Sequence, residues 1–330
     1  MPRRRRILVL LNPHAGRGAL GGVTPQQFSD DAGIDAEIIV PDPDDHAVQM
    51  AQARRELAEG VDAVLVRGGD GMVAAGVNLV AQTEVPLGVI PAGTGNDFVR
   101  AARLPLSSPA ALQHLLTALR APELTTVAVD ALHVILRAPG VTREWWVANS
   151  LNIGFDAEVN QRAETLRHIP GSLRYLVGLV QSLPRFHTRR MRLQLDEVAH
   201  DLDVALICVH NGGYIGGGIP LNTQAKHDDG VLNVSTVGRV SRTGVTLLFP
   251  LVYLGAHRLL RPLSAHQATR LRIHIPAGVP VYADGEAVHA PPLGTPSATE
   301  DAGNHELQVQ VVPGAVRLIH SETVRHTQTW

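Results

Sequence analysis

The sequence predicts an α/β domain followed by a β-rich domain, and three observations support this fold class. The chain has 330 residues, a length typical of about two domains. Residues 1–120 alternate short apolar runs with helical patterns, as expected for a parallel sheet with crossover helices. From about Thr126 onward, apolar runs of strand length follow one another with few helical stretches, which is typical of an antiparallel sheet.

Within the first domain, turns rich in glycine follow three of the four expected strands. The expected strands are 7–11, 36–40, 61–66 and 87–90, and the expected helices are 47–59, about 72–82 and a helical region reaching about residue 119. The turns are 12–22, 68–71 and 91–98. In an open α/β sheet such turns lie at the edge formed by the carboxyl ends of the strands, where ligands bind.

The second domain begins near Pro122, where the composition changes. Only two helical stretches are expected there, at 173–183 and 244–260, and residues 291–304 are expected to form an exposed loop. The expected strands are 127–137, 145–149, 190–195, 204–209, 231–237, 271–275, 279–283 and 307–312.

Composition excludes several classes of protein. Hydrophobic residues make up 45% of the chain and charged residues 18%, which excludes a long disordered protein, and the net charge of −2 excludes a global basic field for nucleic acid. The single cysteine, Cys208, lies in an apolar run and is expected to be a buried small hydrophobe. The apolar stretches 7–11 and 244–256 are too short for a signal peptide and a membrane span, respectively, so we expect a cytoplasmic protein without a transmembrane segment.

The three glycine turns suit a phosphate group. Backbone N–H groups at a helix start attract anions, and glycine lets the backbone approach them closely. The second turn also carries Asp70, which should repel phosphates unless it meets a cation or takes up a proton; the alternative is that Asp70 caps a helix. The third turn offers Thr94, Asn96 and Asp97, and there too the alternative is a helix capped by Asn96 or Asp97.

Six motifs follow one another along the chain: Asn12-Pro13 with Gly16, Gly68-Gly69-Asp70-Gly71, 91–98, Asn211-Gly212-Gly213-Tyr214 with 216–218, 225–232 and Asp284-Gly285-Glu286. Taken together, they resemble the motifs of the diacylglycerol kinase catalytic-domain family, which includes bacterial lipid kinases, sphingosine kinases and ceramide kinases. The Gly68–Gly71 motif alone would be ambiguous, because NAD kinases and phosphofructokinases share it; the combination is specific and covers almost the whole chain.

This resemblance implies a two-domain fold, with an N-terminal phosphofructokinase-like α/β domain, a C-terminal antiparallel β-sandwich and nucleotide in the cleft between them. The first domain would comprise residues 1–125 with a returning segment 315–330, and the lipid-substrate domain would comprise 126–314.

The resemblance also implies the site residues. Glu286 would act as general base on a lipid hydroxyl beside Asp70, since a carboxylate within reach of an alcohol helps to remove its proton. A magnesium site would use the Asp229 carboxylate and the backbone carbonyls of Lys226 and Val231. Without the resemblance, the segment around Asp229 is equally typical of a turn, and Glu286 is typical of a surface turn. The ATP-binding residues would be Asn12, Gly68, Gly69, Asp70, Gly71, Met72, Val73, Gly93 and Thr94.

Some positions depart from the family pattern. Met72, Ala74 and Ala75 stand where the family often has Thr and Asn-Glu, and Pro41 replaces a nucleotide-contacting Thr of many bacterial relatives. The nucleotide contacts are therefore expected to differ. Residues 185–192 hold four arginines after an apolar helix; they are consistent with a packed helix that has a solvated basic end, or with a lipid-facing surface.

We therefore predict an ATP- and magnesium-dependent lipid kinase of phospholipid metabolism that converts diacylglycerol to phosphatidate. It would act at the membrane surface and bind no nucleic acid, and a homodimer is left open. An NAD kinase-like enzyme is the alternative with the same fold. A nucleotide- or lipid-sensing protein with weak catalysis is the alternative from another class, motivated by Met72, Ala74 and Ala75.

Overall fold

The structure is a computed structural model that forms two compact units. The first unit contains the chain up to Ala131 and from Pro313 onward, and the second is Leu132–Val312. The expected Gly16 turn, the helix beyond residue 244 and the loop 291–304 lie outside the described residues. The residues that the structure describes are 5–12, 15, 36–42, 45–166, 169, 171–222, 224–241, 244, 263–276, 278–289 and 305–320.

The first unit contains the predicted parallel sheet. Its strand order is β2-β1-β3-β4, and every neighbouring pair is parallel. The end of β18 adds to β4 in parallel, with Leu318 opposite Leu87. The strands are β1 (Arg5–Leu11), β2 (Ala36–Ile39), β3 (Ala63–Gly68), β4 (Leu87–Pro91) and β18 (His305–Ile319).

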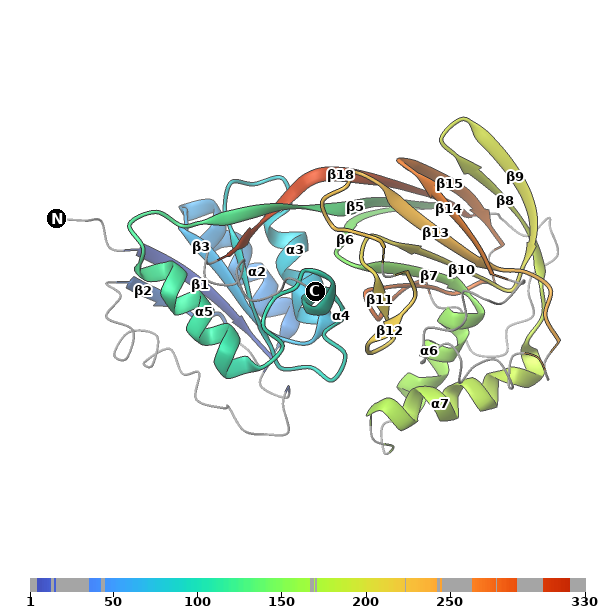
Figure 1. Ribbon diagram of the computed structural model, residues 1–330, viewed down its shortest axis with the longest axis horizontal. Helices are drawn as coiled ribbons and strands as arrows, with labels where there is room; N and C mark the ends of the chain where they lie inside the picture. Colours follow the sequence, from blue (N-terminus) through green and yellow to red (C-terminus); the bar gives the residue numbers. More distant parts are fainter. Residues whose placement is uncertain are drawn as a thin grey trace. The chain divides into compact units, whose positions relative to one another are not determined.

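Helices pack on both faces of this sheet, as Figure 1 shows. On the α5 face, a Cβ added to Gly88 would lie 2.8 Å from the Leu115 side chain. On the opposite face, a Cβ added to Gly76 of α3 would lie 2.7 Å from the Val66 side chain, so α3 packs directly on the strands. The helices are α2 (His46–Glu59), α3 (Asp70–Val80), α4 (Asp97–Ala101) and α5 (Ser108–Arg120).

The second unit is the predicted antiparallel sandwich. One layer contains β5 (Thr126–Ala138), β6 (Val141–Val147), β8 (Arg189–Leu195), β9 (Val198–Val204), β15 (Arg270–Ile275) and part of β18. The other has the order β14-β13-β10-β7-β16-β17, formed by Leu263–Ala268, Leu232–Val237, Leu206–His210, Ser150–Gly154, Val281–Ala283 and Glu286–His289. A short pair, β11 (Tyr214–Ile215) and β12 (Ile219–Pro220), forms a third sheet.

The six-stranded sheet has one apolar and one polar face. Residues such as Leu151, Val209 and Val234 alternate with polar neighbours, and they join side chains of the other layer in one apolar core. The opposite face carries side chains that are polar and yet buried, including Ser150 and Asn152 of β7. Buried polar groups need hydrogen-bond partners, so this face is where a network of contacts is expected.

The prediction of only two helical stretches in the second domain was wrong. A further helix, α6 (Phe155–Thr165), precedes the predicted one, α7 (Gly171–Ser182), and a short 3-10 turn, η1 (Leu183–Arg185), follows it. The apolar positions of α6 recur at every fourth residue, at Phe155, Val159 and Ala163, among charged residues that hide the pattern. None of the described helices is long and apolar enough to cross a membrane.

The predicted strand 204–209 was also wrong as a single strand. The chain leaves β9 at Val204 and enters β10 at Leu206, and these strands belong to different sheets. Ala205 marks the crossing: its N–H donates to the Val237 carbonyl at 2.8 Å, and its carbonyl accepts from Phe155 N–H at 2.9 Å. An uninterrupted apolar run gives no local signal of this change of partners.

Candidate functional site

The ends of β1, β3 and β4 bring the predicted turns together in the first unit. The Asn12 N–H donates to the Arg67 carbonyl at 3.1 Å, and the Ala92 N–H donates to the Gly68 carbonyl at 2.8 Å. Parallel strands place their carboxyl ends at one sheet edge, so neighbouring strands deliver neighbouring turns.

Close packing explains the glycines of the second and third turns. A Cβ added to Gly93 would lie 2.5 Å from the Gly69 Cα, and one added to Gly69 would lie 3.3 Å from the Gly93 Cα. A Cβ added to Gly68 would lie 2.3 Å from the Met72 side chain. Only glycine fits where the two backbones meet, so the stacking of the turns requires these residues whether or not a phosphate binds there.

Asp70 is the first residue of α3, and its carboxylate faces the start of α4. Its Oδ1 accepts from the Phe98 N–H at 3.2 Å, which ties the second turn to the third. Burial, and after it the negative charge of Asp97, raise the pKa of Asp70 from 3.8 to about 6, a net shift that backbone hydrogen bonds from Phe98, Asp97 and Asn96 partly oppose. A carboxyl group with such a pKa can exchange a proton near neutral pH.

Helix capping in this region differs from the alternative that the sequence suggested. Gly69, which precedes α3, provides no side-chain cap, and Asp70 accepts from α4 instead of its own helix. Asn96 precedes α4 in the left-handed conformation, with φ 53°, and its side chain does not cap α4. It bonds to Gly93 instead, since Oδ1 accepts from the Gly93 N–H at 3.2 Å and Nδ2 donates to the Gly93 carbonyl at 2.9 Å.

The start of α3 is suited to an anion. The first N–H groups of a helix have no partner within it and carry the positive end of the helix dipole. Met72 and Val73 already donate their N–H groups to the Gly69 carbonyl, at 3.0 and 3.2 Å. The N–H groups of Asp70 and Gly71 are therefore the better candidates for phosphate contacts. The Thr94 hydroxyl is on an exposed residue in the neighbouring turn.

Two of the positions that depart from the family pattern are used for packing. Met72 is 6% exposed and lies against Gly68, and Pro41 is buried. Ala74 and Ala75 are half-buried within α3. None of these four side chains offers a polar group to a nucleotide.

In the second unit, Glu286 is the first residue of β17 and its side chain is exposed. It follows a two-residue turn, Asp284–Gly285, hereafter the Asp284 turn, in which both residues have positive φ, 48° and 86°. Asp284 is 7% exposed, and its carboxylate accepts three backbone hydrogen bonds, from Ala148 at 2.7 Å, Asn149 at 2.9 Å and Ser150 at 3.0 Å. The turn that carries Glu286 is thus held by a buried carboxylate.

The same segment contacts the Asn211-Gly212-Gly213-Tyr214 motif. The Asn211 N–H donates to the Asn149 carbonyl at 2.8 Å, and the Asn149 Nδ2 donates to the Tyr214 carbonyl at 2.8 Å. Asn149 connects the two motifs, and sequence reasoning did not select it. The only signal for it was an asparagine at the end of a predicted strand.

The predicted magnesium ligands lie on a turn of the same unit. Asp229 is exposed, and its Oδ1 accepts from the Val231 N–H at 3.1 Å; Lys226 is exposed as well. Among the described residues, no group of three or more His, Cys, Asp or Glu side chains could hold a metal ion. Carboxylate and carbonyl oxygens are the ligands that magnesium prefers, so these residue types fit such a site chemically.

Comparisons with known proteins agree on one family. Residues 6–127 match the diacylglycerol kinase catalytic domain, and residues 149–320 match the YegS C-terminal NAD kinase β-sandwich-like domain. A protein of Mycobacterium tuberculosis named diacylglycerol kinase is 34% identical over 290 residues, which cover 85% of this chain and 88% of that protein. A probable lipid kinase YegS-like protein of Stenotrophomonas maltophilia is 28% identical over 278 residues, covering 81% and 82%.

Solved structures support the fold. A diacylglycerol kinase from Bacillus anthracis is similar over 98% of this chain and 100% of its own, with a TM-score of 0.66 and 21% identity. Yeast NADH kinase, solved with NADH, is similar over 99% of this chain and 89% of its own, with a TM-score of 0.52 and 11% identity. At these identities the likeness concerns the fold alone.

Proposed function

Because the chain belongs to the diacylglycerol kinase catalytic-domain family and is a lipid kinase, we propose that it transfers the γ-phosphate of ATP to a lipid hydroxyl, with diacylglycerol as acceptor and phosphatidate as product. The relative from Mycobacterium tuberculosis carries the name diacylglycerol kinase, which favours diacylglycerol over other lipid alcohols.

The observation that carries this proposal is the environment of Asp70. A carboxyl group with a pKa of about 6 lies at the start of α3, where the residue before the helix supplies no side-chain cap. Above pH 6 its charge is poorly solvated, so a cation that arrives with a nucleotide would be attracted to it. The same helix start offers N–H groups to phosphate oxygens.

In this mechanism the Asp70 and Gly71 N–H groups and the Thr94 hydroxyl orient the phosphates. Phosphoryl transfer depends on such positioning and on neutralising charge, and magnesium, when bound, supplies part of that positive charge. Asp229, with the carbonyls of Lys226 and Val231, would hold a magnesium ion within the second unit. Glu286 would accept the proton of the lipid hydroxyl as it attacks.

The test of Glu286 is the substitution Glu286→Gln. The amide keeps the shape but is a far weaker base, so kcat should fall by about 10²–10⁴. ATP affinity should be unchanged, because the phosphates are assigned to turns of the first unit. The measurement is transfer from radiolabelled ATP at saturating lipid, beside titration calorimetry with ATP.

A matched control is Glu197→Gln, which also removes an exposed glutamate, here the second residue of the turn between β8 and β9, and should leave kcat unchanged. Turnover of Glu286→Gln at the parent rate would reduce Glu286 to a turn residue. The same assay should include sphingoid bases, phosphatidylglycerol and polyprenols as acceptors. Transfer to NAD in place of lipid would identify an NAD kinase-like enzyme, and ligand binding without transfer would identify a sensor.

Peripheral contact with a membrane is a further part of the proposal. Helix α7 exposes Leu176 (42%) and Val180 (56%), which are one turn apart on its surface. Arg190 and Arg192 of β8 are exposed too. Apolar and basic side chains together favour an anionic lipid surface, which co-sedimentation with phosphatidylglycerol vesicles would detect.

A further inference from the structure

Asp284 is a buried carboxylate to which the mechanism above assigns no role. Its carboxylate accepts three backbone hydrogen bonds from residues 148–150, and its own N–H donates to the Ser150 carbonyl at 2.8 Å. These partners are 134 to 136 residues away in sequence. The contacts therefore fix the Asp284 turn to β7, a strand inside the six-stranded sheet.

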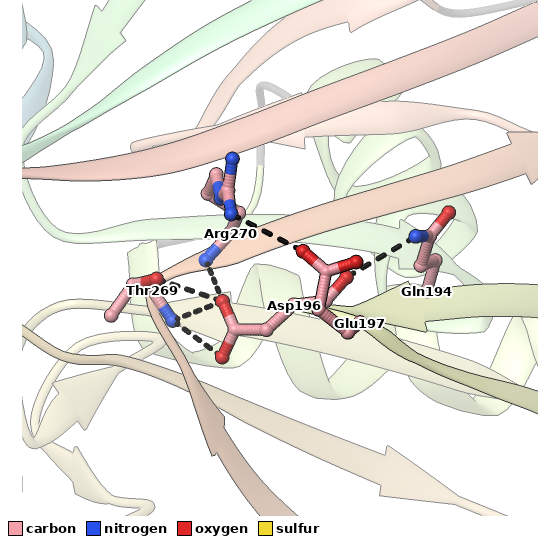
Figure 2. Close-up of polar contacts among 5 residues, drawn as sticks. All are labelled: Gln194, Asp196, Glu197, Thr269 and Arg270. Carbon is pink, nitrogen blue, oxygen red and sulfur yellow. Dashed lines mark hydrogen bonds and ion pairs between the residues drawn. The ribbon is translucent and has the colours of Figure 1, made fainter.

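The second unit contains another turn built in the same way, which shows what the arrangement does for folding alone. Asp196, in the turn between β8 and β9, has φ 49°, and its N–H donates to the Arg270 carbonyl at 2.9 Å. Its carboxylate accepts from the Thr269 N–H and hydroxyl and from the Arg270 N–H (Figure 2). These hydrogen bonds lower the pKa of Asp196. The next residue, Glu197, is exposed and pairs with Arg270 on the surface.

Both turns lead into a strand at the edge of its sheet, since β9 follows the Asp196 turn and β17 follows the Asp284 turn; the difference is that a candidate catalytic residue begins β17. Glu286 begins β17, which lies at the edge of its sheet and, among the described strands, pairs with β16 alone. Ala283 of β16 lies opposite Glu286, so the short turn between them sets where Glu286 begins. An edge strand has no second neighbour to hold it in place. The backbone position of Glu286 therefore depends on the Asp284 turn.

We propose that Asp284 is a positioning residue that holds Glu286 in the geometry for proton removal; this inference rests on the proposed function of Glu286. Asp284 does not touch the substrate in this account. Its carboxylate holds the turn by three hydrogen bonds, and the turn presents the Glu286 side chain. A displacement of about 1 Å at a reacting group can lower a rate by about 10²-fold.

The first experiment is the substitution Asp284→Asn. Asparagine tolerates a left-handed conformation but has one acceptor oxygen, so its amide nitrogen would face an N–H group that the carboxylate had accepted. We expect kcat for diacylglycerol to fall by about 10²-fold while the ATP dissociation constant is unchanged. Asp196→Asn makes the same change in the matched turn and should leave kcat unchanged.

A double-substitution cycle separates positioning from general damage. If Asp284 acts through Glu286, then adding Asp284→Asn to Glu286→Gln should lower kcat no further, because the group being positioned is already inactive. A residue with a purely structural role would lower kcat by the same factor in both backgrounds. An equal factor in both backgrounds, or parent-like kcat in Asp284→Asn, overturns the inference.

A second variant decides the matter if Asp284→Asn does not fold. Gly285 has φ 86° and nothing within 4 Å of an added Cβ, so Gly285→Ala strains the Asp284 turn without removing a contact. Gly140, in the turn between β5 and β6, has φ 74° and is equally open, so Gly140→Ala is its control. We expect kcat to fall by about 10-fold in Gly285→Ala alone.

The outcomes distinguish this inference from the proposed function. Equal kcat in Gly285→Ala and Gly140→Ala overturns the positioning role. Parent-like turnover by Glu286→Gln overturns the assignment of Glu286 itself. A parent enzyme that phosphorylates none of the tested lipids overturns the proposed function, and this inference with it.

Discussion

The two candidate carboxylates are arranged in opposite ways. In the first unit, Asp70 is itself partly buried, and burial together with Asp97 raises its pKa to about 6. In the second unit, Glu286 is exposed, and the buried carboxylate is its neighbour Asp284. Burial and a neighbouring charge change the pKa of Asp70, whereas the backbone contacts of Asp284 fix the position of Glu286.

The two regions should therefore tolerate different kinds of substitution. In the first region, the turn that precedes Asp70 packs against the next turn so closely that no Cβ fits between Gly69 and Gly93. The Asp284 turn has open space around Gly285 and depends on hydrogen bonds to residues 148–150. The first region should therefore respond to changes of volume and charge, and the second to changes of hydrogen bonding and backbone conformation.

The largest expected effect is on turnover in Asp70→Asn. Loss of a charged group at the phosphate-binding helix start should lower kcat by about 10²–10⁴. In the parent, kcat/KM should fall on the acid side with a midpoint near pH 6, where Asp70 takes up its proton. Near-normal kcat in the variant would leave Asp70 only its structural contact with Phe98.

The same substitution should stabilise the fold above pH 6. The folded pKa of Asp70, about 6, exceeds its ordinary value of 3.8. Its contribution to stability is therefore favourable below pH 3.8 and is lost as the pH rises through 6, by up to about 3 kcal/mol. Asp70→Asn should raise the melting temperature at pH 8, and the gain should vanish near pH 4. A loss of stability at pH 8 would contradict this account.

The next largest effect is expected from adding a side-chain atom where the two glycine turns meet. Gly93→Ala should lower stability by about 1–3 kcal/mol, because its Cβ must displace the Gly69 backbone, and it should weaken ATP binding. Gly285→Ala should leave ATP binding unchanged, since its strain is confined to the second unit. Calorimetric melting and ATP titration of both variants measure the contrast. Equal ATP affinities would mean that the stacked turns do not bind the nucleotide.

The smallest expected effect is a change in melting temperature with magnesium, which tests whether Asp229 of the second unit binds the ion as well as accepting a hydrogen bond within its own turn. If Asp229 binds magnesium, the ion should raise the melting temperature of the parent by about 2–4 °C for about 1 kcal/mol of binding free energy. Asp229→Ala should abolish that response. Asp228, the exposed residue before Asp229, provides the control, and Asp228→Ala should keep the rise in melting temperature with magnesium. An equal response in Asp229→Ala and the parent would remove Asp229 from the magnesium site.

Much of the fold and part of the site could be predicted from the sequence. Alternating apolar runs and helical patterns are local properties, and they predicted the parallel sheet of β1 to β4 and its helices. Parallel topology then required the turns after β1, β3 and β4 to share one sheet edge. The motifs Gly68–Gly71 and Asp284–Glu286 lie in the order of the family pattern, so the family was accessible as well.

Other features depended on contacts between distant residues. The break at Ala205 depends on which sheet each half of an apolar run joins, and its partners are Val237 and Phe155. The pKa of Asp70 depends on Asp97, which another turn supplies. By itself, the sequence determined the strands and helices of the first unit and the residue types at each turn, because local patterning carries that information. Only the tertiary structure decided that Asp284 binds residues 148–150, because hydrogen bonds across some 135 positions leave no periodic trace in a chain.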